Sequence, residues 1–177
     1  MASNHQAERD RFLRLFDRLV SSTTQMVEAM PADKRQAVPV ENPSVRFGDR
    51  LLRVTAKDLF IHTIVAEHCW ARDLSCCEDR AVVALPRDAA LTQRLSSNDY
   101  LNMAKSIHSN NIEIFTGLSE DQMEKNVSFN GSDWTVMGLL WGIYSYRAFH
   151  LGNIDIYVRQ FGTEPADFFN FAKQSMA

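Results

Sequence analysis

The scarcity of glycine and proline constrains the fold of this chain more than any other feature of its sequence. The 177 residues include only 7 glycines and 5 prolines, whereas these two residues make up about 12% of an average protein. Because turns depend on them, a chain so poor in both is expected to have few turns and long elements. An all-β sandwich needs a turn about every 8–12 residues and is excluded.

Apolar residues recur at steps of three and four, which indicates helices with one buried face. Thr55 and Asp58 have the spacing of a capping box at a helix start, and Gly162 suits the position just after a helix end. The segments 76–95 and 118–133 are interpreted as connections. We therefore expect one all-α domain over residues 1–177: a four-helix bundle with long connections and a short C-terminal helix from Thr163. The four helices are predicted over residues 3–30, 55–74, 96–118 and 135–161.

Charge and cysteine content limit the partners and the compartment. The net charge of -3 gives no reason to expect binding to nucleic acid or to anionic membranes. The longest mostly apolar stretch, 136–144, is much shorter than the about 20 residues of a membrane span. Three cysteines, two of them adjacent at Cys76 and Cys77, are typical of a reducing compartment. A cytoplasmic protein with no nucleic-acid or membrane partner is predicted.

The fourth predicted helix is apolar on nearly all sides, so it should be covered on more than one side. Either the phenylalanines near the C-terminus or a second subunit could cover it, and we expect a homodimer. Trp70 and Trp134 are expected to pack as core at the ends of the bundle rather than to form a ligand platform.

Histidines are the main candidates for chemistry. His62 shares a helix face with Leu59 and Ala66 and is expected to point inward, whereas His68 is expected to point away. His150 lies on an apolar face of the fourth helix. Two inward histidines on different helices are how bundles build metal and ligand sites. Two hydrogen-bonded core histidines remain the alternative interpretation.

Two segments, LFIHTIVAEHCW (59–70) and YRAFHLGNIDIYVRQFG (146–162), together resemble the paired motifs of the DinB-like metal-binding four-helix-bundle family. That family has one inward histidine on the second helix. On the fourth helix it has a His-x-x-x-His pair, then a small residue, an amide and an Arg-x-x-Gly ending. The residues that match this pattern are His62, His150, Gly152, Asn153, Arg159 and Gly162.

The chain departs from the family pattern at Tyr146, which stands where the first histidine of the pair is expected. Tyr146 and His150 lie four residues apart and so share a helix face. A phenol with a pKa of about 10 costs roughly 4 kcal/mol to ionise at neutral pH. Three arrangements remain open: a metal held by His62, Tyr146 and His150 with Asp58 and Asn153 nearby; a weakly held metal; or a metal-free pocket.

The resemblance implies a divalent metal ion, nickel or zinc, and a small-molecule substrate. It also implies the activity of a metal-dependent hydrolase or of a transferase that uses a low-molecular-weight thiol. The alternative is a metal-free bundle that binds a small molecule or is purely structural. Arg46, Arg50 and Arg53 form the one basic cluster that could bind an anion, although a solvated face is the simpler interpretation.

Overall fold

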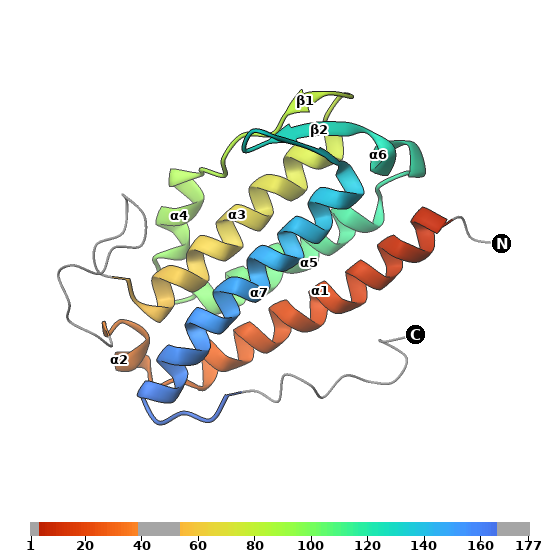
Figure 1. The fold of residues 1–177 in the computed structure, drawn as a ribbon. Helices are drawn as coiled ribbons and strands as arrows, with labels where there is room; N and C mark the ends of the chain where they lie inside the picture. Colours follow the sequence, from red (N-terminus) through yellow and green to blue (C-terminus); the bar gives the residue numbers. More distant parts are fainter. Residues whose placement is uncertain (1–3, 39–53, 166–177) are drawn as a thin grey trace.

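Four long helices form the bundle that the sequence predicts (Figure 1). The computed structural model describes residues 4–38 and 54–165. The cluster of Arg46, Arg50 and Arg53 lies outside these described residues. So does the predicted C-terminal helix, except for residues 163–165, which are not helical. The bundle helices are α1 (Asn4–Ala29), α3 (Ala56–Cys76), α5 (Tyr100–Thr116) and α7 (Val136–Gln160).

Capping residues explain where α3 and α7 begin. The Thr55 side chain accepts the backbone N–H of Asp58, and the Asp58 carboxylate accepts the backbone N–H of Thr55, so the predicted capping box is present. Thr135 caps α7 in the same way, through the backbone N–H of Gly138. Gly162 follows α7 with a φ of 72°, a left-handed conformation that glycine adopts without steric cost.

The start of the third bundle helix was predicted too early. Ser96 closes a separate short helix, α4 (Ala89–Leu95), and α5 begins only at Tyr100. The segment 89–95 has its own cap, because the side chain of Asp88 accepts the backbone N–H of Leu91. The structure therefore has two helices, α4 and α5, where one helix starting near Ser96 was expected.

Helices that follow one another along the chain are not always neighbours in the bundle. α1 packs mainly against α7 and α5, and α3 packs mainly against α5 and α7. α1 and α7 run in the same direction, since Trp141 near the start of α7 donates a hydrogen bond to Glu8 near the start of α1 (2.9 Å). α3 and α5 are also parallel, since Lys57 at the start of α3 lies 4.6 Å from the ring centroid of Tyr100.

This arrangement explains the long connection between α3 and α5. Parallel neighbours require the chain to return along the full helix, which for α3 is about 30 Å at 1.5 Å per residue. The segment 77–99 covers that distance with a short strand, an extended stretch and α4 (Figure 1).

A small sheet covers one end of the bundle (Figure 1). Its strands are β1 (Ala81–Val82), β2 (Asn126–Phe129) and β3 (Ser132–Thr135), with β1 parallel and β3 antiparallel to β2. Asn130 and Gly131 form the β2–β3 turn with φ values of 52° and 77°, as expected for the favoured two-residue hairpin turn. This sheet lies mainly in the two segments interpreted as connections and was not predicted. The short helices α2 (Ala32–Arg35) and α6 (Glu120–Glu124) were not predicted either.

The core holds the four helices together along their whole length. At the end near the sheet, Phe12 and Phe16 of α1 stack on each other and meet Phe115 of α5 edge-on. At the other end, Phe60 and Ile64 of α3 are buried among residues of α1, α5 and α7. Among the described residues, no helix is long and apolar enough to span a membrane.

Candidate functional site

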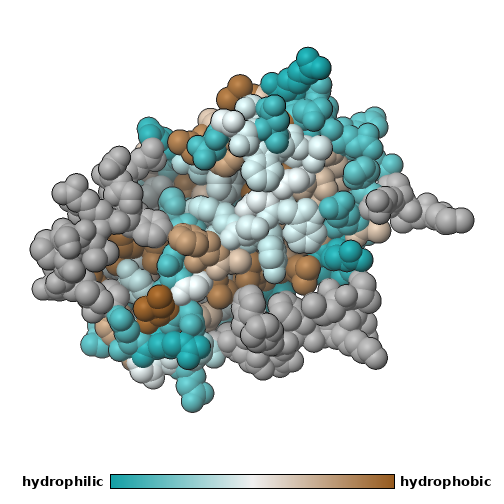
Figure 2. All heavy atoms as spheres, viewed as in Figure 1, coloured by the Kyte–Doolittle hydropathy of each residue, from teal (hydrophilic) through white to brown (hydrophobic). Residues whose placement is uncertain are grey.

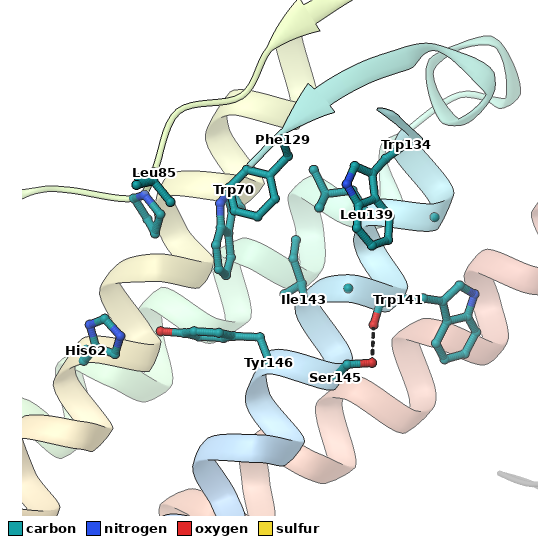
Figure 3. Close-up of a pocket in the computed structure, with 13 residues that line it drawn as sticks. His62, Trp70, Leu85, Phe129, Trp134, Leu139, Trp141, Ile143, Ser145 and Tyr146 are labelled. Atoms are coloured by element: carbon teal, nitrogen blue, oxygen red, sulfur yellow. Dashed lines mark hydrogen bonds between the residues drawn. The ribbon is translucent and has the colours of Figure 1, made fainter. Parts of the chain in front are cut away.

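The side chains of His62, Tyr146 and His150 meet between α3 and α7. The ring centroids of His62 and His150 lie 5.3 Å apart, and those of Tyr146 and His150 lie 4.4 Å apart. The ring of Tyr146 is 5.9 Å from that of His62, and its hydroxyl points toward the imidazole (Figure 3). The structure thus brings together the three residues that the sequence analysis selected.

The two histidines of α3 do not lie as the sequence analysis expected. His62 faces α7, yet its side chain is exposed rather than buried in the core. His68, expected to point away, is half-buried, and its Nδ1 lies 3.1 Å from Oδ1 of Asn111 on α5. The reason is that α3 has two neighbours, α5 and α7, so residues on both flanks of this helix meet another helix.

His150 is a neutral imidazole at neutral pH. Its side chain is only 3% exposed. Burial lowers the pKa of His150 to about 4, and the electrostatic effects of the neighbouring His62 and Arg147 act in the same direction. A neutral imidazole keeps one nitrogen lone pair for a metal ion or for a hydrogen-bond donor.

Tyr146 is held as a protonated phenol. Burial raises the pKa of Tyr146 well above its ordinary value, and the nearby carboxylate of Glu67 raises it further, while Arg147 opposes them. The hydroxyl is buried and has no hydrogen-bond partner among the described residues. A buried hydroxyl without a hydrogen-bond partner destabilises the folded state. The hydroxyl of Tyr146 is therefore a candidate hydrogen-bond donor to a bound molecule.

The spacing of the two imidazole rings is compatible with a divalent ion held between them. A metal–nitrogen distance of about 2.0–2.1 Å places the centroids of two imidazoles on a tetrahedral ion about 5 Å apart, and those of His62 and His150 are 5.3 Å apart. Tyr146 could become a third ligand only by losing its proton. Within residues 4–38 and 54–165, no group of three or more His, Cys, Asp or Glu residues could hold a metal ion.

Asp58 and Asn153, the two residues expected beside the site, have different surroundings. Oδ2 of Asp58 accepts hydrogen bonds from the backbone N–H (3.1 Å) and the hydroxyl (2.7 Å) of Thr55, so this carboxylate caps α3. Asn153 lies on α7 one turn after His150 and is half-buried. Its Nδ2 is buried and makes no hydrogen bond to any described residue.

A buried ion pair next to the site was not predicted from the sequence. The guanidinium of Arg147 donates through Nε and Nη2 to the two carboxylate oxygens of Glu67, and both side chains are completely buried. The pair joins α7 to α3 beside Tyr146. The available signal was that Glu67 and Arg147 each stand within a strongly apolar stretch of a helix. Such charged residues are almost never fully buried unless they are paired.

A cavity of about 690 Å³ opens beside His62 and Tyr146 (Figure 3). Trp70 of α3, Phe129 of β2 and Trp134 of β3 line it, together with one face of α7. Trp70 is buried in the core, as expected. Trp134 is partly exposed instead, because it lies on the β2–β3 hairpin, which was not predicted. His150 is buried and lies outside the lining.

Comparisons with known proteins place the fold. No protein-family model and no curated protein matches the sequence. Among solved structures, YfiT from Bacillus subtilis is similar, with a TM-score of 0.61, 16% identity and coverage of 93% of this chain and 92% of that chain. YfiT is described as a probable metal-dependent hydrolase with an unusual four-helix bundle topology. The two chains share this fold.

Proposed function

We propose that the protein is a DinB-like bundle that holds a divalent metal ion, nickel or zinc, between His62 and His150 and acts as a metal-dependent hydrolase on a small molecule. The observation that carries the proposal is the meeting of these two imidazoles at a spacing suited to one shared ion. The description of the structurally similar YfiT as a probable metal-dependent hydrolase supports the same activity.

Each residue of the site has a part in this proposal. A bound divalent ion would polarise a substrate carbonyl and lower the pKa of a bound water. The hydroxyl of Tyr146 donates a hydrogen bond to the substrate. The pair of Glu67 and Arg147 keeps α7 in place against α3, so the imidazoles of His62 and His150 stay close.

The metal content of the untagged protein tests the proposal. We expect close to one nickel or zinc ion per chain after dialysis against either metal, and loss of that ion in His62→Ala and in His150→Ala. His68→Ala is the matched control, because His68 lies on the same helix but faces Asn111 on α5. Metal retained in both site variants, or lost equally in the control, would refute the assignment.

A second candidate function is a metal-free bundle that binds a small molecule. It is favoured by the phenol of Tyr146, which is protonated at neutral pH and makes no hydrogen bond to the described part of the chain. Tyr146→His separates the two candidates. If the wild type binds no metal and the variant gains tight zinc or nickel binding, the metal-free candidate is correct.

The nucleophile could be water or a low-molecular-weight thiol, and the second choice would make the protein a thiol transferase. The products distinguish the two reactions. Incubation of the metal-loaded protein with a substrate and a thiol gives an acid in the first case and a thiol adduct in the second.

Two further parts of the proposal concern assembly and location. Phe149 and Ile156 lie seven residues apart on the outer face of α7 and are 64% and 55% exposed. In the space-filling view, apolar and weakly polar residues gather over the middle of this side of the molecule (Figure 2). We propose a cytoplasmic homodimer that covers this face, and light scattering of the purified protein measures its mass.

A further inference from the structure

The cavity beside Tyr146 has the size of a small-molecule site. Its volume of about 690 Å³ lies within the about 300–1,000 Å³ that is usual for ligand pockets. Among the described residues, its lining contains no Lys, Arg, Asp or Glu side chain. A charged group placed here would lose its hydration without gaining an opposite charge, so the cavity favours an uncharged molecule.

Five aromatic residues contribute to the wall. Trp70 stands edge-on to Phe129 and to Tyr146, with ring centroids 5.7 and 5.0 Å apart. Trp134 and Trp141 complete the aromatic lining, so all three tryptophans of the chain lie here. Aromatic walls offer both faces and edges to a flat ring, which favours an aromatic ligand over a branched aliphatic one.

Two glycines keep the cavity open on the side of α7. A Cβ atom at Gly138 would lie 3.8 Å from Cε3 of Trp134, and one at Gly142 would lie 3.9 Å from Cζ3 of the same ring. Glycine inside a helix is less favourable than alanine. At Gly142 a Cβ atom would only touch the indole ring at an ordinary van der Waals distance, whereas a longer side chain would reach into the cavity that both glycines line.

Two hydrogen-bond donors at the cavity point to an acceptor on the ligand. The hydroxyl of Tyr146 and the indole Nε1 of Trp70 are both buried, and neither has a hydrogen-bond partner among the described residues. An indole N–H can only donate. His62 and Tyr146 both line the cavity, and the Tyr146 hydroxyl points toward His62 (Figure 3), so a ligand carbonyl that enters between these two side chains would satisfy this donor.

We propose that this cavity binds an uncharged aromatic molecule with a carbonyl acceptor, such as an aryl ketone, ester or amide. The ring system lies against the aromatic wall of the cavity, and the carbonyl accepts the hydrogen bond of Tyr146. This binding depends on the cavity alone. That the bound aryl ester or amide is also the substrate rests on the proposed hydrolase function.

Equilibrium dialysis of the full chain without added metal tests the binding with three matched probes. Acetylnaphthalene is neutral and has a carbonyl, naphthoate has the same rings with a negative charge, and ethylnaphthalene lacks the acceptor. We expect acetylnaphthalene to bind. Naphthoate should bind at least about tenfold more weakly because of its charge, and ethylnaphthalene about fivefold more weakly because it lacks one hydrogen bond.

Variants on one helix locate the binding. Gly142→Leu should weaken acetylnaphthalene binding at least tenfold by filling the cavity. Gly152→Leu is the matched control, because Gly152 lies on the same helix at an exposed position where an added Cβ meets nothing within 4 Å. Trp134→Ala is a second variant at a partly exposed position that should also weaken binding, so the test does not depend on the folding of a single variant.

The outcomes separate this inference from the proposed function. Naphthoate bound as tightly as acetylnaphthalene, no binding of acetylnaphthalene, or equal binding by the wild type and a folded Gly142→Leu variant would each overturn the inference. Binding by a chain that takes up no metal would uphold it and would refute the hydrolase proposal instead.

Discussion

Removal of one partner of the buried pair of Glu67 and Arg147 should destabilise the protein more than any other single charge change in the bundle. Both side chains have no exposed surface and are joined by two parallel hydrogen bonds. In Glu67→Gln the guanidinium would stay buried beside a neutral amide. Breaking a buried pair in this way costs about 3–5 kcal/mol, a large share of the about 5–15 kcal/mol that stabilises a typical domain.

Replacement of both charges should recover most of this loss. In the double variant Glu67→Leu with Arg147→Met, no charge remains in the core and the side-chain volumes stay similar. Such apolar replacements of buried pairs are often neutral or stabilising. We expect the free energy of unfolding of the double variant to lie within about 1 kcal/mol of the wild-type value, although each single change is strongly destabilising.

Urea denaturation followed by circular dichroism measures these free energies. For a chain of this size, a loss of about 3–5 kcal/mol should lower the Tm by about 6–20 °C. Asp155→Asn is the matched control. It removes one carboxylate from an ion pair with Arg159 on the surface of α7, and such pairs contribute at most about 1 kcal/mol.

Two results would refute the reasoning. One is a Glu67→Gln variant as stable as the Asp155→Asn control, which would mean that water or rearrangement compensates the buried guanidinium. The other is a double variant as unstable as the two single changes added together, which would mean that packing rather than the lost charge accounts for the effect.

Other parts of the fold make three further measurable predictions. Gly131→Ala should cost about 1 kcal/mol, because Gly131 has a φ of 77° in the hairpin turn and a Cβ disfavours that conformation; an unchanged urea midpoint would contradict this. Burial raises the pKa of the Cys77 thiol, so iodoacetamide at neutral pH should modify the exposed Cys76 much faster; equal rates in peptide mass spectrometry would argue against the structure here. The Asp79 carboxylate accepts the backbone N–H of Asn126 at 2.8 Å, which lowers the pKa of Asp79. The stability advantage of the wild type over Asp79→Asn should therefore be complete above the unfolded pKa of about 3.9 and disappear as the pH falls through the lower folded value; an advantage in urea that grows on acidification would refute it.

The long helices were predictable because their signals are local. The step of three and four along α1, the capping box of Thr55 and Asp58 and the stop at Gly162 depend only on neighbours in the chain. The hairpin had a local signal too, Asn130 followed by Gly131. It was missed because the flanking strands are short and lie in a segment interpreted as connection.

The candidate site was predictable only in part. The spacing of Tyr146 and His150 places both on one face of α7, and the family resemblance points to His62. The exposure of His62 and the contact of His68 with Asn111 depend on which helices flank α3, and a single helix pattern does not contain that order. The role of Trp134 depends on the hairpin for the same reason.

The sequence by itself determined four long helices, since helix periodicity and caps act over a few residues, and its resemblance to a known family pointed to His62, Tyr146 and His150. Only the tertiary structure decided that α3 and α5 run parallel, that Glu67 and Arg147 pair across the core, and that three tryptophans surround one cavity. These features join residues as far as 80 positions apart. Their partners are chosen by how the helices pack, because burial and charge pairing act through space rather than along the chain.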